Sequence, residues 1–149
     1  MLIKPILRIV AEYMAEYELL DWIDLDKVDW YELSSNPNAI HLLEKNLDKV
    51  DWGWLSLNPN AIHILEKNLD KVNWNYLSKN PNAIHILEKN LDSTYLENRK
   101  IRTKVNWGML SYNPNAIHIL EKNLDKVEWC ELSLNPNIFK LNTDKNFTR

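Results

Sequence analysis

Four histidines recur at one position of a repeated pattern and have the side chains most able to do chemistry. They are His41, His63, His85 and His118. Each stands three residues before a glutamate, so that imidazole and carboxylate share one helix face and could hold a metal ion. A lysine follows each glutamate on that face and repels a cation. The pattern therefore predicts a solvated face with His–Glu and Glu–Lys contacts within and between units, and no metal site.

Five tryptophans form a second recurring series, each three residues before a leucine. They are Trp30, Trp52, Trp74, Trp107 and Trp129. A row of aromatic rings can stack nucleobases. The spacing of three instead favours a short helix whose tryptophan and leucine face the core of each unit. Trp54 lies outside this series, and we expect its side chain to be exposed.

No constellation of catalytic residues accompanies these series. With two glycines in the chain, a Gly-rich phosphate loop is excluded. Cys130 has no histidine near it in sequence, and Ser56 ends a predicted helix beside no base. We expect no catalytic residue, no cofactor and no enzymatic activity.

The charge balance and the single cysteine bear on partners and compartment. The 18 basic and 21 acidic residues give a formal net charge of −3, which does not favour nucleic acid as a partner. Cys130 cannot form an internal disulfide, so a reducing, intracellular compartment fits best. Charged residues interrupt residues 1–20, which predicts neither a signal peptide nor a membrane span.

The element that positions these residues is a tandem repeat. The triplet Asn-Pro-Asn begins at Asn36, Asn58, Asn80, Asn113 and Asn135, with spacings of 22, 22, 33 and 22 residues. A unit of this length cannot close a core alone, so neighbouring units must stack. The sequence therefore predicts an all-α fold, an α-solenoid of 22-residue two-helix repeats with atypical N- and C-terminal caps.

The unit that begins at Asn58 shows where the two helices should lie. Asn58 is a good N-cap with proline at the first helical position, which predicts a helix from Pro59 to about Lys67. Asn68 is expected to end it in the left-handed conformation. The second helix runs from the tryptophan to the serine of each unit. Its expected caps are Asp29, Asp51, Asn73, Asn106 and Glu128.

The repeats divide the chain into segments of one predicted domain, residues 1–149. Residues 1–28 are an N-terminal cap in which an amphipathic helix over 9–25 takes the place of a first helix. Residues 29–92 are repeats, 93–103 an insertion and 104–134 a further repeat. Residues 135–149 form a C-terminal cap, with a shortened last helix and a polar tail.

The string Asn-Pro-Asn-Ala-Ile-His-(Leu/Ile)-Leu-Glu-Lys-Asn, followed by Asp-Trp-x-x-Leu-Ser, resembles the short helical repeats that giant DNA viruses of amoebae encode in many copies. The resemblance extends from about Asp26 to Leu141. It implies an intracellular repeat protein, in the host cytoplasm or the virion. It assigns no functional residue, and the insertion after Asp92 departs from the simple period.

Positions that differ between units are free to recognise a partner, because the fold does not fix them. They lie on or just after the second helix, so that stacking aligns them in one strip. Four of them have side chains of types enriched at protein interfaces: Trp54, Tyr76, Met109 and Tyr112. The alternative is an ordinary variable surface or filler between units.

The insertion over 93–103 is a second candidate site, because loops between units commonly carry function. It contains a basic cluster beside an aromatic side chain: Tyr95, Arg99, Lys100 and Arg102. We expect this cluster to contact an acidic partner surface or a phosphate backbone, with an inert loop as the alternative. Thr94-x-x-Glu97 has the form of a capping box, which predicts helix in part of the insertion.

Together these patterns predict a non-catalytic scaffold for protein–protein interaction, with a protein partner and no membrane association. The first alternative is an RNA-binding helical repeat, in which two or three side chains of each unit read one base. The second is a structural subunit that assembles end to end with copies of itself.

Overall fold

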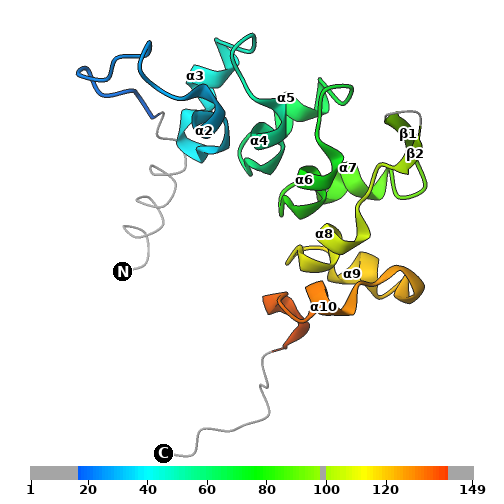
Figure 1. Ribbon diagram of the computed structural model, residues 1–149. Coiled ribbons are helices and arrows are strands. Elements are labelled where there is room, and N and C mark those ends of the chain that lie inside the picture. The colour runs from blue at the N-terminus through cyan, green and yellow to red at the C-terminus, as the bar shows by residue number, and fades with distance from the viewer. Residues whose placement is uncertain (1–16, 98–99, 141–149) are drawn as a thin grey trace, which may run out of the picture.

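The computed structural model describes residues 17–97 and 100–140, and only the backbone of residues 95–97 and 100–102. Short helices alternate between two rows along an arc (Figure 1). The inner row follows the repeated tryptophans: α2 (Trp30–Ser35), α4 (Trp52–Leu57), α6 (Trp74–Lys79), α8 (Trp107–Tyr112) and α10 (Trp129–Leu132). The outer row follows the Asn-Pro-Asn triplets: α3 (Ile40–Glu44), α5 (Ile62–Glu66), α7 (Ile84–Glu88) and α9 (Ile117–Leu120).

Each inner helix packs against the next inner helix, and this pattern repeats from α2 to α10. Three 3₁₀ helices complete the described helical elements: η1 (Pro37–Ala39), η2 (Leu124–Lys126) and η3 (Pro136–Ile138). Strands β1 (Thr94–Glu97) and β2 (Lys100–Thr103) belong to the insertion. The repeats are therefore helical and pack in a repeated pattern, as the sequence predicts.

The inner helices begin at the expected caps. Asp51 has an extended backbone, and its side chain accepts a hydrogen bond from the N–H of Trp54 at 2.8 Å. Asp29, Asn73 and Asn106 cap their helices in the same way. Glu128 makes no such side-chain bond, so the cap predicted there is wrong. Four of the five starts thus follow from one short polar side chain before the tryptophan.

The outer helices are shorter than the sequence predicts. The Asn58 side chain accepts from the N–H of Asn60 at 3.0 Å, an Asx turn that places Pro59 in a turn and delays α5 until Ile62. At the other end the Asn68 amide donates to the carbonyl of Ile64 at 2.8 Å. Asn123, which corresponds to Asn68 in the last repeat, has φ −137° and is therefore not left-handed.

One buried asparagine in each unit ties that unit to the one before it. The Asn80 amide nitrogen donates to the carbonyls of Ser56 at 2.9 Å and Asn58 at 3.0 Å. Its oxygen accepts from the N–H of Asn82 at 3.0 Å. Equivalent contacts are made by Asn58, Asn113 and Asn135. A single side chain therefore caps its own turn and satisfies two carbonyls of the preceding unit.

The serine that ends each inner helix adds a second link between units. The Ser56 hydroxyl donates to the carbonyl of Trp52 at 2.6 Å and accepts from the N–H of Asn73 in the next unit at 3.0 Å. Ser34, Ser78 and Ser111 repeat this pair of bonds. In the described part of the chain, no buried side-chain nitrogen or oxygen lacks a partner.

Apolar side chains fill the space between the two rows. Leu55 and Leu77 of the inner row and Ala61, Leu65 and Leu87 of the outer row are fully buried. A valine of the connecting segment joins this core in each unit: Val50, Val72, Val105 and Val127. The core is thus a narrow band that continues from unit to unit.

The tryptophans are covered by the unit that follows. Trp74 is 5% exposed, and the amino group of Lys104 lies 4.9 Å from its ring centre. Trp30, Trp52 and Trp107 are half-buried beneath the corresponding lysines, Lys49, Lys71 and Lys126. Trp129 is 64% exposed, because no described unit follows it. The core position predicted for the series is confirmed for Trp74 and wrong for Trp129.

The caps differ from expectation at the N-terminal side. Residues 17–25 form turns and irregular backbone, so the predicted helix over 9–25 is wrong for these residues. Residues 9–16 and the tail from 141 to 149 lie outside the described residues. At the other end, η3 provides the shortened last helix that the sequence predicts.

Replacing Asn80 by alanine should destabilise the fold far more than the same change at Asn82. Asn80→Ala removes the donor to the carbonyl of Ser56 and the acceptor for the N–H of Asn82, whereas the carbonyl of Asn58 still accepts from the N–H of Ala61 at 3.2 Å. Each buried unpaired group costs about 1–3 kcal/mol. The Asn82 amide donates only to the exposed carbonyl of Pro59, so Asn82→Ala should cost about 1 kcal/mol or less. Urea denaturation of both variants measures the difference. Equal losses would contradict the role assigned to the buried asparagine.

A second pair of variants tests how the tryptophans are covered. Trp74→Ala should lower the free energy of unfolding by about 3–5 kcal/mol, because it empties a large buried site. Trp129→Ala should cost less than about 1 kcal/mol, since its side chain is mostly exposed. Thermal melts followed by circular dichroism compare the two. A large loss from Trp129→Ala would show that residues beyond those described cover its ring.

Candidate interaction surface

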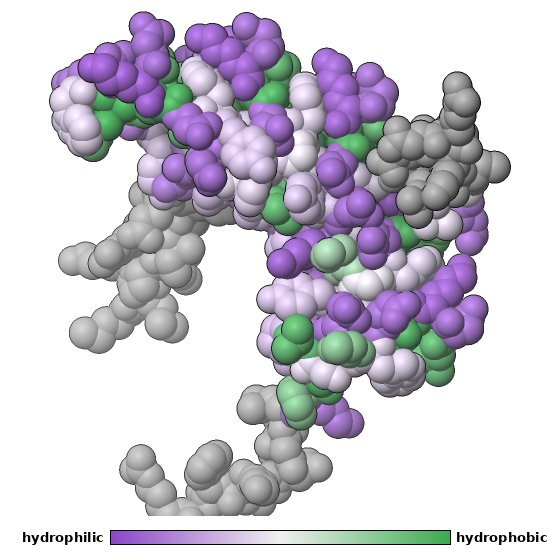
Figure 2. All heavy atoms as spheres, in the orientation of Figure 1, coloured by the Kyte–Doolittle hydropathy of each residue, from purple (hydrophilic) through white to green (hydrophobic). Residues whose placement is uncertain are grey.

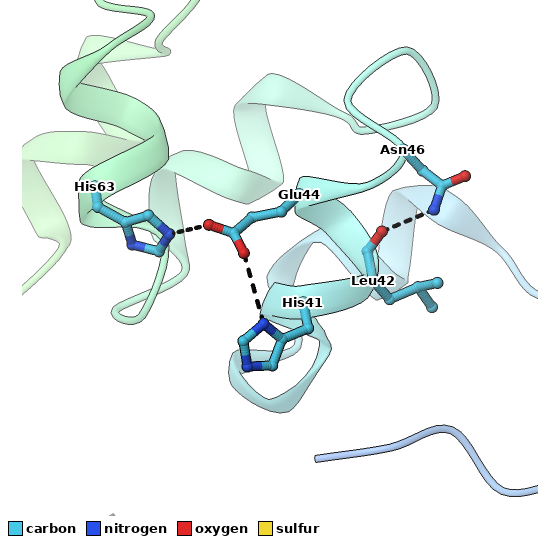
Figure 3. Close-up of polar contacts among 5 residues, drawn as sticks. All are labelled: His41, Leu42, Glu44, Asn46 and His63. Atoms are coloured by element: carbon cyan, nitrogen blue, oxygen red, sulfur yellow. Dashed lines mark hydrogen bonds and ion pairs between the residues drawn. The ribbon is translucent and has the colours of Figure 1, made fainter. Parts of the chain in front are cut away.

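The repeated histidines bridge neighbouring units along the outer row. The Nε2 atom of His63 lies 2.6 Å from a carboxylate oxygen of Glu44, one unit earlier in the chain. Figure 3 shows Glu44 between this histidine and His41 of its own unit, whose Nδ1 atom is 3.6 Å from the other oxygen. His85 with Glu66, and His118 with Glu88, repeat the bridge at 2.6 and 2.9 Å. The expected His–Glu contacts are therefore present between units, and within a unit at His41 and Glu44.

This ladder has the properties of a solvated structural face. Its histidine and glutamate side chains are between 39% and 51% exposed. Exposed ion pairs contribute about 0–1 kcal/mol each. Among the residues described, no group of three or more potential metal ligands gathers. Figure 2 shows hydrophilic side chains along the outer margin of the arc, consistent with a face in contact with water.

Three aromatic side chains lie in series on the inner row. The ring centres of Tyr31 and Trp54 are 5.1 Å apart, in an edge-to-face arrangement. Those of Trp54 and Tyr76 are 6.1 Å apart with a tilt of 35° between the rings. These rings come from α2, α4 and α6, so the strip crosses three consecutive units. Trp54 and Tyr76 are two of the predicted binding residues, whereas Tyr31 is not among them.

The strip borders a cleft of about 430 Å³. Gly53 lies in this cleft, where an added Cβ would stand 3.0 Å from a carboxylate oxygen of Asp51 and 3.5 Å from the Tyr76 ring. The absence of a side chain at Gly53 therefore keeps the space beside Tyr76 open. The remaining lining is largely polar: Lys71, Val72, Asn73, Trp74 and Asn75. We call Tyr31, Trp54, Tyr76 and this space the aromatic cleft.

Met109 and Tyr112, the other two residues of the predicted strip, lie on α8 and do not line the cleft. Met109 is 38% exposed. The ring of Tyr112 lies 4.6 Å beneath the amino group of Lys79. The structure thus groups Trp54 with Tyr76, and leaves Met109 and Tyr112 as a separate part of the inner row.

The insertion forms a hairpin, so the helix predicted from Thr94-x-x-Glu97 is wrong. Strands β1 and β2 are antiparallel, with Thr94 opposite Thr103 and Tyr95 opposite Arg102. A single turn of helix is unstable without packing partners. The β-branched and aromatic residues of the insertion favour an extended backbone instead. Lys100 also lies on a strand, whereas Arg99 lies outside the described residues.

The links between units continue across this hairpin. The N–H of Lys104 donates to the carbonyl of Ser93 at 2.8 Å, which closes the base of the insertion. Beyond it, the Asn113 amide donates to the carbonyls of Ser78 at 3.1 Å and Asn80 at 2.9 Å, as in units without an insertion. The hairpin is therefore an addition to the array and does not interrupt it.

Deleting residues 93–103 should leave the array intact. The deletion joins Asp92 to Lys104, which restores the Asp-Lys pair of the other units and removes no described link between them. We expect the free energy of unfolding to change by about 1 kcal/mol or less, because loop length alone has a small entropic effect. Chemical denaturation tests this. A loss of several kcal/mol would show that the hairpin packs on the array.

Comparison with known proteins assigns no relative. No protein-family model matches the chain, and neither a curated protein nor a solved structure matches it significantly. Within the described ranges 17–97 and 100–140, no helix has the length and apolar character needed to cross a membrane.

Proposed function

We propose that this chain is a non-catalytic α-solenoid scaffold that binds a protein partner through its inner row. The observation that carries the proposal is the aromatic cleft. Tyr31 is 48% exposed, and Trp54 and Tyr76 are half-buried beside an open space. Exposed aromatic side chains around a hollow are typical of the anchoring positions of protein interfaces.

The division between fixed and variable positions supports the same proposal. The asparagine and serine common to the units are buried and hydrogen-bonded to neighbouring units, so they are not accessible to a partner. The histidine and glutamate of the outer row bond to each other. The cleft contains positions that differ between units and is open to solvent. Its side chains can therefore contact a partner and determine which partner binds.

An RNA-binding repeat is less well supported. The rings of the cleft touch edge to face and at a tilt, which leaves little room for a base to stack between them. The lysine of each connecting segment is engaged over a tryptophan ring. The formal net charge of −3 adds no general attraction for phosphate.

End-to-end assembly is the second candidate, favoured by one observation. Exposed apolar side chains gather at the α10 end, where Figure 2 shows strongly hydrophobic atoms. Trp129, Leu134 and Phe139 are 64%, 68% and 80% exposed. Light scattering over a range of concentrations separates the two candidates, because assembly raises the mean mass with concentration whereas a scaffold of this kind stays monomeric.

We place the protein inside cells, in the host cytoplasm or the virion of a giant virus of amoebae. This part of the proposal rests on the resemblance of the repeat and on the single cysteine. In this proposal the hairpin supplies a second contact through the basic cluster of the insertion. Its members are Tyr95, Arg99, Lys100 and Arg102.

The cleft can be tested with two matched double variants. Trp54→Ala with Tyr76→Ala removes two rings from the inner row, whereas His63→Ala with His85→Ala removes two exposed rings from the outer row. Affinity capture from an extract of amoebae, quantified by mass spectrometry, should yield a protein that the inner-row variant loses and the outer-row variant retains. Thermal melts establish that both variants are folded.

The same proteins captured by the parent and both variants would overturn the proposed role of the cleft. A partner retained by the inner-row variant but lost on deletion of residues 93–103 would transfer recognition to the hairpin.

A further inference from the structure

We infer that the occupant of the aromatic cleft is an extended, proline-rich peptide segment in the polyproline II conformation. The inference rests on the proposed function and names the chemistry of the partner. Three properties of the cleft support it: the spacing of the rings along the aromatic strip, the polar groups beside it, and the form of backbone that surrounds it.

The spacing of the rings along the strip allows one turn of a polyproline II helix to reach more than one ring. Such a helix has three residues per turn and rises about 3.1 Å per residue, so side chains three positions apart recur about every 9 Å on one face. Successive ring centres are closer together than one such turn, 5.1 Å from Tyr31 to Trp54 and 6.1 Å from Trp54 to Tyr76. Two prolines separated by two residues can therefore each contact a ring.

The polar groups beside the rings include donors as well as acceptors, but the side-chain oxygens of Asp51 and Asn73 already accept from the N–H groups that they cap. The indole N–H of Trp54 and the hydroxyl groups of Tyr31 and Tyr76 make no hydrogen bond to another described residue. Asn75 adds an amide nitrogen to the lining, whereas the amino group of Lys71 is engaged over the Trp52 ring, 4.8 Å from its centre. A polyproline II segment has carbonyls without internal partners, and its prolines have no N–H to satisfy. The donors of the cleft complement that backbone.

Other forms of peptide fit less well. A bound strand needs a sheet edge, and the inner row that surrounds the cleft is helical. A bound helix satisfies its own carbonyls and relies on a continuous apolar groove. Here Asp51, Lys71 and Asn73 interrupt the apolar lining. Aromatic side chains with nearby donors are instead the usual surface on which proline-rich segments dock.

Gly53 provides a matched pair of variants with Gly108. Both glycines occupy the second position of an inner helix, in α4 and α8. Gly53→Ala adds a methyl group 3.5 Å from the Tyr76 ring, inside the cleft. Gly108→Ala adds the same group outside it, 3.3 Å from the capping oxygen of Asn106 and 3.8 Å from the side chain of Glu128. The two changes alter helix propensity equally, and both crowd the capping oxygen of their helix, at 3.0 Å from Asp51 and 3.3 Å from Asn106, but only Gly53→Ala narrows the cleft. Thermal melts of both variants measure the effect of this crowding on stability.

Fluorescence polarisation with the full chain tests the inference. The probes are labelled decaproline, a glycine–serine peptide of equal length, and oligouridine. We expect decaproline to bind in preference to both others. Trp54→Ala should weaken that binding by about tenfold or more, since a buried tryptophan anchor commonly carries that share of the affinity. Gly53→Ala should weaken it several-fold, and Gly108→Ala should leave it unchanged.

Equal binding of decaproline and the glycine–serine peptide would overturn the inference, as would unchanged decaproline binding by Trp54→Ala or stronger binding of oligouridine. These results are distinct from failure of the proposed function. If the inner-row variant still loses a captured protein while decaproline does not bind, the scaffold role stands and only the peptide class is wrong. If Trp54→Ala does not weaken decaproline binding and the inner-row variant still captures the same proteins as the parent, both proposals fail.

Discussion

The double hydrogen bond from one buried asparagine amide to the preceding unit is the interaction on which the rest of the structure depends. The chain turns from the inner to the outer row at Asn58 and its equivalents, and a turn inside a core exposes carbonyls that water cannot reach. The Asn80 amide satisfies two such carbonyls while its oxygen caps the turn of its own unit. Neighbouring units can therefore approach closely enough for the leucines between the rows to pack.

This constraint separates the residues that build the array from those that can act. Ser56, Asn58 and Leu55 have no freedom, because each is buried and in contact with a neighbouring unit. Trp54 lies one position from Leu55 but at the inner surface, where the fold requires no particular side chain. Only residues that take no part in these links can vary without disturbing the array. The variable residues of the aromatic cleft, on the inner helices, belong to this group.

The sequence predicted what depends on spacing and on local capping. The period of 22 residues, the starts of four inner helices and the polar outer face follow from residue types at fixed intervals. The sequence did not predict the hydrogen bonds from Asn80 to the preceding unit. An asparagine before a proline already indicates a cap, so nothing in the sequence shows that its amide also donates to distant carbonyls. The sequence analysis also missed the hairpin and the contact of Tyr31 with Trp54. Strand pairing and the direction in which two side chains lean are set by packing between segments, and no single segment encodes them.

Each unit offers donors to the unit before it and acceptors to the unit after it, so that its two faces are complementary. A gene segment of one unit, copied in tandem and in frame, would therefore encode a protein in which both new junctions are already matched. No compensating substitutions would be needed for the longer array to fold. Such a chain can gain or lose variable positions along its inner row while its architecture stays constant, so that arrays of different length and surface can arise by recombination alone.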